Sequence, residues 1–495
     1  MQGKIKKTQY MEIQDRYIVA VDLGTSKIGL TVAKVEGENV QIMYYKETPS
    51  EGIRNSGVFN ESKVSEPLAE AIRQAENALG IKITQAVVGM PKYPVRQEIS
   101  TGKIEGRGYD TDITAEDIAE LKRSAQEMYP LENPNMEAIY GAVAQSFSDG
   151  ESFQIIENDI IGMTSDILEG NFKIFIGKKS SLAKIDTVLK KAGIVTARKY
   201  FTADTTAKAV LLDSEMENGV AMIDFGGGCV SVSVYHGSIM RYYACIPFGG
   251  KNITGDIQIE SEGSIGRDLA ENIKIAFGAC MPEKLQNLSE KIIHIKSENG
   301  EADKKLPVKY LSEIITARIE EILMAIFYEI QQSGFADRLM SGIVVTGGCA
   351  QTANLGNLIY DISGYRVRTG YPRHMFSFQG CEGITDTSAA TSIGLVMAAK
   401  EDANINCAFP KEGMTSDFFA KPHTSEPELE AEPVQEEEQT DDTLLHFEEV
   451  DPEPIKKEEV KKKKIKIPKV TWFDQFGKFC GSLYDSVHQE IENED

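Results

Sequence analysis

Two short segments, about two hundred residues apart, place an aspartate and one or more glycines directly after an apolar run. The first is DLGTSK at residues 22–27 and the second is DFGGG at residues 224–228. Glycine lets backbone N–H groups approach an oxyanion closely because it has no Cβ, and hydroxyl and ammonium groups add further donors. The two segments therefore predict a divided binding site for a phosphate chain. The residues expected in this site are Asp22, Gly24, Thr25, Ser26, Lys27, Asp224, Gly226, Gly227 and Gly228.

Carboxylates at the two strand ends would bring a metal ion to this site. Asp22 and Asp224 are expected to orient water molecules on a Mg²⁺ ion that neutralises the phosphates. A third apolar run, residues 343–346, ends in Gly347 and Gly348, where a nucleoside can lie flat against the backbone. Any one of these turns could be only a tight hairpin. Their order and spacing together favour a nucleotide site.

Buried strands must position these turns. The apolar runs 17–22, 220–224 and 343–346 each end abruptly in glycine, which is typical of a strand followed by a tight turn. Alternating segments at 28–35 and 230–235 follow the first two turns, so each of those turns is predicted to be a β-hairpin tip. A P-loop or a Rossmann loop would instead lead into a helix, and neither motif occurs at such a junction.

Helical periodicity appears between the strands, and the alternation predicts α/β domains. The chain of 495 residues is too long for one small core, and the repeated hairpin indicates a distant internal duplication. The stretches with helical periodicity are 65–79, 115–128, 181–192 and 311–332.

The order of DLGTSK, DFGGG and TGG resembles the actin, Hsp70 and sugar-kinase superfamily, and within it the chain is most similar to the FtsA family. The resemblance covers residues 16–400 and the C-terminal helix. The segments that carry it are VGMP at 88–91, IGM at 161–163, LEG at 168–170, IPFGGKNITGDI at 246–257, AENIK at 270–274, TGGCAQ at 346–351 and AATSIGL at 389–395.

The resemblance implies an α/β, actin-like two-domain ATPase fold, built from duplicated ribonuclease H-like domains with two inserted subdomains, 1C and 2B. It implies ATP and Mg²⁺ in the interdomain cleft, with Glu271 and Lys274 at positions that contact ribose and adenine in relatives. The alternative for these two residues is a solvated helix face. The implied subdomains are 1A at 15–98 with a closing helix at 380–400, 1C at 99–178, 2A at 179–248 and 336–379, and 2B at 249–335.

Hydrolysis of ATP is expected to be slow at most. Cys229 stands where relatives usually carry threonine, and a thiol is a weaker donor to phosphate than a hydroxyl. The one candidate for a catalytic acid is Asp204, in the segment where hydrolytic relatives place such a residue. Some members of the FtsA family have an apolar residue at that position.

The composition changes after Lys400. Residues 401–464 are first acidic and then basic, and are too poor in large apolar groups to fold, so they predict a disordered linker. Residues 465–490 then predict an amphipathic helix that binds anionic lipid. The alternative is a helix packed on the protein's own core. The apolar residues expected to enter the membrane are Trp472, Phe473, Phe476, Phe479, Leu483 and Val487.

The bulk composition narrows the range of partners. A formal net charge of −23 argues against nucleic acid. Seven scattered cysteines without CxxC pairs predict free thiols in a reducing cytosol. The N-terminus does not read as a secretory signal, and no stretch reaches the roughly 18 apolar residues that span a bilayer, so any membrane contact is expected to be peripheral.

By resemblance, the expected function is that of a cell-division scaffold at the division septum, on the cytoplasmic face of the inner membrane. Such a protein binds ATP, assembles with itself into actin-like filaments, tethers the ring of the tubulin-like protein FtsZ and helps to recruit other divisome proteins. Two alternatives remain open. One is a membrane-associated scaffold of the pilus-assembly or rod-shape type, and the other is a small-molecule kinase of the same superfamily.

Overall fold

The computed structural model describes residues 16–108, 110–261, 265–285, 290–295, 304–411 and 445–446. The predicted linker beyond residue 411, apart from residues 445–446, and the predicted membrane helix at 465–490 lie outside the described residues.

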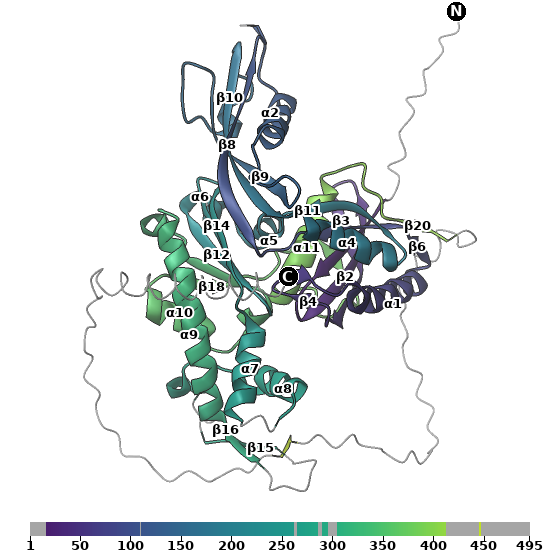
Figure 1. Ribbon diagram of the computed structural model, residues 1–495, viewed down its shortest axis with the longest axis vertical. Helices are drawn as coiled ribbons and strands as arrows, with labels where there is room; N and C mark the ends of the chain where they lie inside the picture. Colours follow the sequence, from purple (N-terminus) through teal and green to yellow (C-terminus); the bar gives the residue numbers. More distant parts are fainter. Residues whose placement is uncertain are drawn as a thin grey trace, which may run out of the picture.

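The first domain is built around a six-stranded sheet in the order β11-β7-β1-β2-β3-β19 (Figure 1). β1 and β2 form an antiparallel hairpin, and β7 and β11 continue the sheet in parallel. The helices α1 and α4 pack against each other, and α11 packs on β1 and α5. The bounds are β1 Arg16–Leu23, β2 Lys27–Glu36, β3 Asn39–Pro49, α1 Glu61–Leu79, β7 Gln85–Gly89, α4 Lys179–Lys191, β11 Val195–Tyr200, α5 Thr202–Val210, β19 Ser377–Phe378 and α11 Ala390–Lys400.

The second domain repeats this plan in a five-stranded sheet of order β14-β13-β12-β17-β18. β12 pairs with β13 in an antiparallel hairpin and with β17 in parallel, as β1 does with β2 and β7. The predicted hairpin tips and the predicted internal duplication are therefore confirmed. The bounds are α6 Asp213–Asn218, β12 Val220–Phe225, β13 Val230–His236, β14 Ile239–Ile246, β17 Ile343–Thr346, α10 Leu355–Ser363 and β18 Val367–Thr369.

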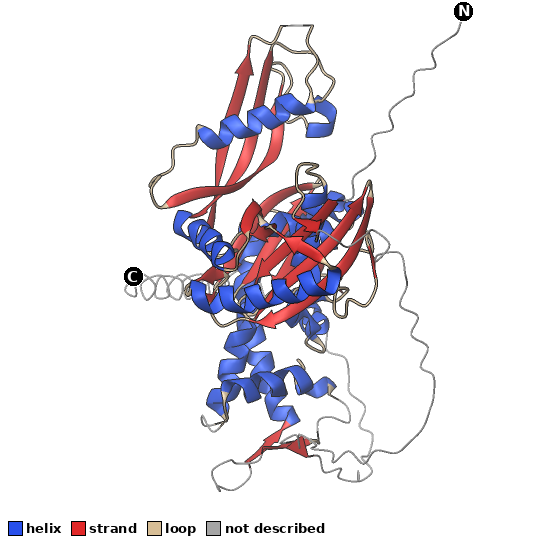
Figure 2. Ribbon diagram, turned by 90° about the vertical axis from the view of Figure 1, so that its right-hand side faces the viewer, coloured by secondary structure: helices blue, strands red, loops and turns tan. Residues whose placement is uncertain are grey.

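A three-stranded sheet with the helix α2 projects from the first domain, at the top of Figures 1 and 2. It has its own apolar core, in which Leu121 of α2 is fully buried against Phe147 and Phe172 of the sheet. At its base, the ring of Phe175 stacks on that of Phe201, with centroids 4.4 Å apart. The bounds are β8 Val95–Glu105, α2 Ala115–Glu127, β9 Glu137–Ser148, α3 Glu157–Ile160 and β10 Ile167–Lys178.

A helical module lies at the opposite end of the molecule, below the second domain in Figure 1. Its helices α7, α8 and α9 share one core with the second sheet, because Ile253, Ile273 and Ile319 are buried with Val232 and Val345. The backbone of β21 pairs with β15 in this module. The bounds are α7 Gly250–Glu260, α8 Arg267–Phe277, β15 Ile292–Ile295, β16 Lys304–Pro307, α9 Val308–Gln332 and β21 Leu445–His446.

The four helices predicted from periodicity are all present, each within a few residues of the predicted bounds. Side-chain caps account for two of the starts. Asn60 caps α1, and Thr114 forms a capping box with Asp117 at the start of α2. The helix predicted at 380–400 is shorter. Gly380 and Gly383 have positive φ angles, which a right-handed helix does not allow, and the helical segment starts with a 3-10 turn at Thr387–Ala389.

Two predicted boundaries are wrong. Residues 179–200, expected in subdomain 2A, form α4 and β11 and belong to the first sheet, because β11 pairs in parallel with β7. A helix between two parallel strands of one sheet is the usual crossover. Residues 401–411, expected in the disordered linker, also pack on the first domain. There β20 (Ala408–Pro410) pairs with β6 (Ile81–Ile83), and Cys407 is fully buried.

Candidate functional site

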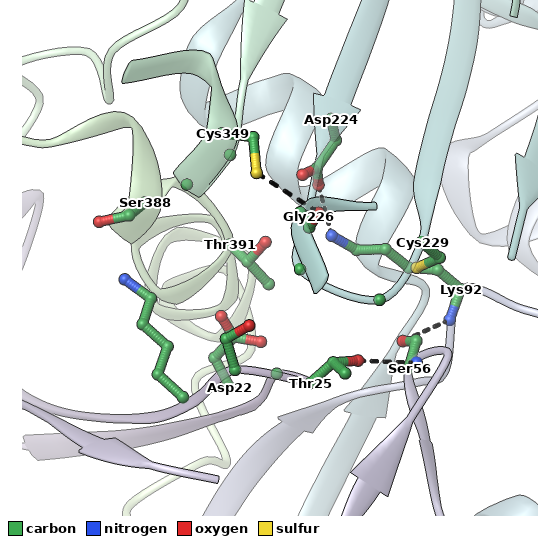
Figure 3. A pocket seen from close by; sticks show the side chains of 18 of the residues that line it. Asp22, Thr25, Ser56, Lys92, Asp224, Gly226, Cys229, Cys349, Ser388 and Thr391 are labelled. Atoms are coloured by element: carbon green, nitrogen blue, oxygen red, sulfur yellow. Dashed lines mark hydrogen bonds and ion pairs between the residues drawn. The ribbon is translucent and has the colours of Figure 1, made fainter. Parts of the chain in front are cut away.

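A cavity of about 360 Å³ lies where the tips of the two hairpins meet (Figure 3). All the residues predicted to bind nucleotide line this one cavity, although they come from four separate parts of the chain. These residues are Asp22, Gly24, Thr25, Ser26, Lys27, Asp224, Gly226, Gly227, Gly228, Glu271, Lys274, Gly347 and Gly348.

The two hairpin tips are in van der Waals contact, and this contact explains the glycines. A Cβ at Gly227 would lie 2.1 Å from Oγ of Ser26, and one at Gly228 would lie 2.5 Å from Oγ1 of Thr25. Lys251 joins the two halves as well, since its Nζ donates to the backbone oxygen of Thr25 at 2.6 Å. Side chains on the second tip would therefore push the two domains apart.

The two aspartates at the strand ends both face the cavity. Asp224 is 5 % exposed and forms an ion pair with Lys92. Burial raises the pKa of Asp22, and the positive charges of Lys92 and Lys27 oppose that rise. Lys27 also forms an ion pair with Glu47 at the edge of the cavity. The site thus holds several carboxylates, each near a lysine.

The third glycine turn packs directly behind Asp224. Gly347 has a φ of 90°, and a Cβ on it would lie 2.7 Å from Oδ1 of Asp224. Gly348 begins the 3-10 turn Gly348–Gln351, which continues the wall of the cavity. Only glycine combines this backbone conformation with such a close approach.

Glu271 and Lys274 lie on α8 and bound the cavity on the side of the helical module. Nζ of Lys274 donates to Oε2 of Glu271 at 2.7 Å, to Oγ1 of Thr254 at 2.9 Å and to the backbone oxygen of Gly250 at 3.0 Å. The side chain of Lys274 is only 13 % exposed. Lys274 therefore does not lie on a purely solvated helix face, which was the alternative interpretation of this residue.

Asp204 is not brought to the cavity, which corrects its assignment as the candidate catalytic acid. Thr202, the first residue of α5, lines the cavity, and Asp204 is two positions further along the helix. Two helical positions differ by about 200° in direction, so Asp204 faces away. Its carboxylate pairs with Lys208 at 3.1 Å and borders a different cavity.

Several cavity residues were not expected from the sequence, and two of them, Ser56 and Lys92, hold polar groups at the centre of the site. Ser56 lies beside the short strands β4 (Ile53–Arg54) and β5 (Gly57–Val58), and Lys92 follows β7. The only signal for Lys92 was its place directly after the segment VGMP at 88–91, at the end of an apolar strand.

The cysteines within the described residues are all free thiols, as predicted. Cys229 lines the cavity and is 5 % exposed. The predicted membrane residues Trp472, Phe473, Phe476, Phe479, Leu483 and Val487 lie outside the described residues. Of the described helices, none combines the length and the hydropathy needed to cross a bilayer.

Comparison with known sequences connects this chain to one family. The family model described as "Cell division protein FtsA" matches residues 221–394. The Cell division protein FtsA of Enterococcus faecalis is 30 % identical over 361 residues, which cover 72 % of this chain and 79 % of the relative. That of Neisseria meningitidis serogroup B is 28 % identical over 393 residues, which cover 79 % of this chain and 91 % of the relative.

Comparison with solved structures identifies the fold. A chain of the PilM-PilN type IV pilus biogenesis complex matches with a TM-score of 0.54 at 14 % identity, over 78 % of this chain and 99 % of that chain. The fold is therefore the predicted actin-like ATPase fold, with two similar α/β domains and two inserted modules.

Proposed function

Since the chain belongs to the FtsA family of cell division proteins, we propose that it binds ATP in the cavity between the hairpins and works mainly as an actin-like scaffold. One observation carries this proposal. Two glycine hairpin tips from two similar domains meet around one cavity that contains Asp22 and Asp224. Main-chain N–H groups at such tips bind phosphate oxygens, and a nucleotide held by both tips would hold the two domains together.

Mg²⁺ fits the donor set of this site. Asp22 and Asp224 would hold the ion through water molecules, with phosphate oxygens completing its shell, and the bound ion would neutralise the triphosphate. Within the described residues no group of three or more histidine, cysteine or acidic side chains could hold a metal by itself. Mg²⁺ usually keeps several waters and binds through one or two carboxylates together with phosphate oxygens, so the two aspartates suit an ion that arrives with the nucleotide.

The nucleoside would lie at the other end of the cavity. Glu271 and Lys274 border that end, and would supply a carboxylate and an ammonium group for ribose and adenine if Lys274 exchanges one of its three present acceptors for the nucleoside. Gly347 and Gly348 expose backbone against which a flat base can pack.

The acidic residues around the cavity are consistent with ATP hydrolysis that is slow at most. In the described part of the chain, the lining carboxylates are Asp22, Glu47, Asp224 and Glu271. The last three already pair with lysines, and Asp22 lies where the metal would be held. A general base must be free to accept a proton from water, so none of these groups is well suited to the task.

The scaffold role includes assembly and attachment. We infer that ATP-bound copies assemble into filaments, that the module of α7–α9 corresponds to subdomain 2B and receives FtsZ, and that the sheet β8–β10 corresponds to subdomain 1C. The helix at 465–490 would attach the assembly to anionic lipid on the cytoplasmic face of the membrane at the septum, where other divisome proteins join it.

ATP titration into the full-length protein tests the central claim. With Mg²⁺ present, we expect saturable binding to the wild-type chain. Gly228→Ala should weaken it by about 10-fold or more, because the new Cβ would lie 2.5 Å from Oγ1, 2.6 Å from Cγ2 and 2.8 Å from Cβ of Thr25, a buried residue. Gly255→Ala is the matched control, since it lies within α7 and its Cβ would meet nothing within 4 Å. A wild-type chain that binds no ATP, or a Gly228→Ala variant that binds normally, would refute the proposal.

The proposed partner requires a separate test. A pulldown with purified FtsZ should retain the full-length chain, and a chain that is not retained would contradict the FtsZ assignment without affecting the ATP site.

A further inference from the structure

Lys92 is a buried lysine whose ammonium group points into the proposed phosphate site. It lies in the short segment Met90–Pro94 between β7 and β8, and its side chain is 14 % exposed. Its Nζ forms an ion pair with Oδ2 of Asp224, a carboxylate at the proposed metal position whose side chain is 6 % exposed. Figure 3 shows this side chain reaching across the cavity from the first domain to the second hairpin.

The backbone of Lys92 is fixed from both domains. Its N–H donates to Oγ of Ser56 at 3.0 Å, and the N–H of Ser56 donates to Oγ1 of Thr25 at 3.1 Å, on the tip of the first hairpin. Its carbonyl oxygen accepts from the hydroxyl of Tyr243 at 2.8 Å, on β14 of the second domain. These contacts fix the backbone that carries the ammonium group. The ion pair with Asp224 therefore differs from an exposed surface ion pair, whose two side chains are free to move apart.

The charges around Lys92 keep it positive. Burial disfavours a charged group, but the ammonium group of Lys92 forms an ion pair with the carboxylate of Asp224, and the carboxylate of Asp22 lines the same cavity. Two carboxylates close together in a buried site repel each other, so a cation between them stabilises the empty site.

The other lysines around the cavity have different partners. Lys27 pairs with Glu47, Lys274 pairs with Glu271, and Lys251 donates to the backbone of Thr25. Within the described residues, Lys92 is thus the lysine that forms an ion pair with a carboxylate at the proposed metal position.

Resting on the ATP site proposed above, we propose that Lys92 is a built-in counter-cation for the phosphate chain. In the empty site its ammonium group neutralises Asp224 and Asp22. When ATP enters, the same group turns to the phosphate oxygens, which a flexible lysine reaches as a point charge. Mg²⁺ and Lys92 therefore both neutralise the negative charge of the phosphates. Because of Lys92, ATP can bind even when Mg²⁺ is absent.

The test compares ATP affinity with Mg²⁺ and with EDTA in the full-length chain. Lys92→Met removes the charge and keeps the length of the side chain. The ratio of the ATP dissociation constant in EDTA to that in Mg²⁺ should rise about 10- to 100-fold in this variant. The reason is that the lost contact between Lys92 and the phosphates is compensated by the metal ion in Mg²⁺ but not in EDTA. Lys92→Arg, which keeps the charge, should restore most of the Mg²⁺-free affinity.

Lys199→Met is the matched control. Lys199 is also paired and largely buried, with a side chain 21 % exposed, but its partner Asp186 lies outside the cavity. The ratio should stay at the wild-type value in this variant.

The outcomes separate this inference from the proposed function. If the wild-type chain binds ATP and Lys92→Met leaves the ratio unchanged, the role of Lys92 is wrong and the ATP site stands. If the wild-type chain binds no ATP with or without Mg²⁺, both proposals fall. Should Lys92→Met not fold, Lys92→Gln carries the same prediction, since it is also neutral and adds polar atoms for the buried site.

Discussion

At the scale of single residues, Cys229 determines which hydrogen-bond donor the second hairpin offers to the cavity. It directly follows the three glycines, lines the cavity and is 5 % exposed. A thiol donates a weaker hydrogen bond than a hydroxyl, so this position contributes less to phosphate binding than a serine or threonine would. The packing around it is tight, because Gly228 beside it touches Thr25.

We predict that Cys229→Ser strengthens ATP binding. Serine is close to cysteine in shape and supplies a hydroxyl donor, and one added neutral hydrogen bond is worth about 1 kcal/mol, or roughly a 5-fold lower dissociation constant. ATP titration in Mg²⁺ measures it. Cys381→Ser is the control, because Cys381 is buried away from the cavity and should leave the affinity unchanged. Equal affinities of the Cys229→Ser and wild-type chains would contradict the prediction.

At the scale of elements, α2 is fixed to its sheet by one leucine and two glycines. A Cβ at Gly102 of β8 would lie 3.0 Å from Cδ1 of Leu121, and one at Gly170 of β10 would lie 2.7 Å from its Cδ2. The glycines thus make room on adjacent strands for the fully buried Leu121. The module has its own core, so it can loosen without disturbing the hairpins.

We predict that Leu121→Ala destabilises this module by about 2–5 kcal/mol, because it leaves a cavity under α2. Chemical unfolding should show the loss, and ATP affinity should stay at the wild-type value. Glu120→Ala, on the exposed face of the same helix, should change stability by no more than about 0.5 kcal/mol. A stable Leu121→Ala variant would mean that the contact does not hold the helix.

A second contact between elements depends on pH. Glu215 of α6 accepts from Nε of Arg368 at 2.6 Å, from Nη2 of Arg368 at 2.5 Å and from the N–H of Leu212 at 2.8 Å, which fastens α6 to β18. Burial alone would raise the pKa of Glu215, but these donors outweigh it and the pKa lies below its usual 4.5.

We predict that Glu215→Gln lowers the free energy of unfolding by about 1 kcal/mol at neutral pH, a modest value because Arg368 is partly exposed. A carboxyl whose pKa is lower in the folded state stabilises fully above its unfolded pKa of 4.5, and loses that contribution as pH falls through the folded value. The difference between variant and wild type should therefore shrink in acid. A difference that stays constant as the pH is lowered would rule out this role.

At the scale of the whole molecule, the cavity lies between the hairpins of the two domains, and the two inserted modules lie at opposite ends of the molecule. Closing the hairpins on a nucleotide would change the angle between domains that carry surfaces far from the cavity. A single amphipathic helix binds lipid reversibly, whereas several on one filament bind far more tightly because each later contact is intramolecular.

We predict that ATP increases the pelleting of the full-length chain with anionic liposomes, and that removal of residues 470–495 abolishes pelleting while ATP affinity is unchanged. Phe476→Asp should act in the same direction as the truncation, because it places a charge on the apolar stripe. Lys199→Met, which changes neither the tail nor the cavity, is the control. Equal pelleting of the truncated and full-length chains would end the membrane proposal.

Local patterns in the sequence were enough to predict the hairpin tips, the glycines and the two aspartates that they bring to the cavity, and four helices. Alternating apolar runs and glycines specify strands and tight turns through short-range sterics. The turns at DLGTSK and DFGGG could therefore be predicted without knowing which distant residues they contact.

Only the tertiary structure decided which surfaces these elements share. Lys92 reaches Asp224 across 132 positions of the chain, β11 joins the first sheet instead of the second, and the segment after Lys400 pairs with β6. Asp204 faces away from the cavity because of the phase of one helix. Such contacts depend on how distant segments pack, and no short window of sequence contains both partners.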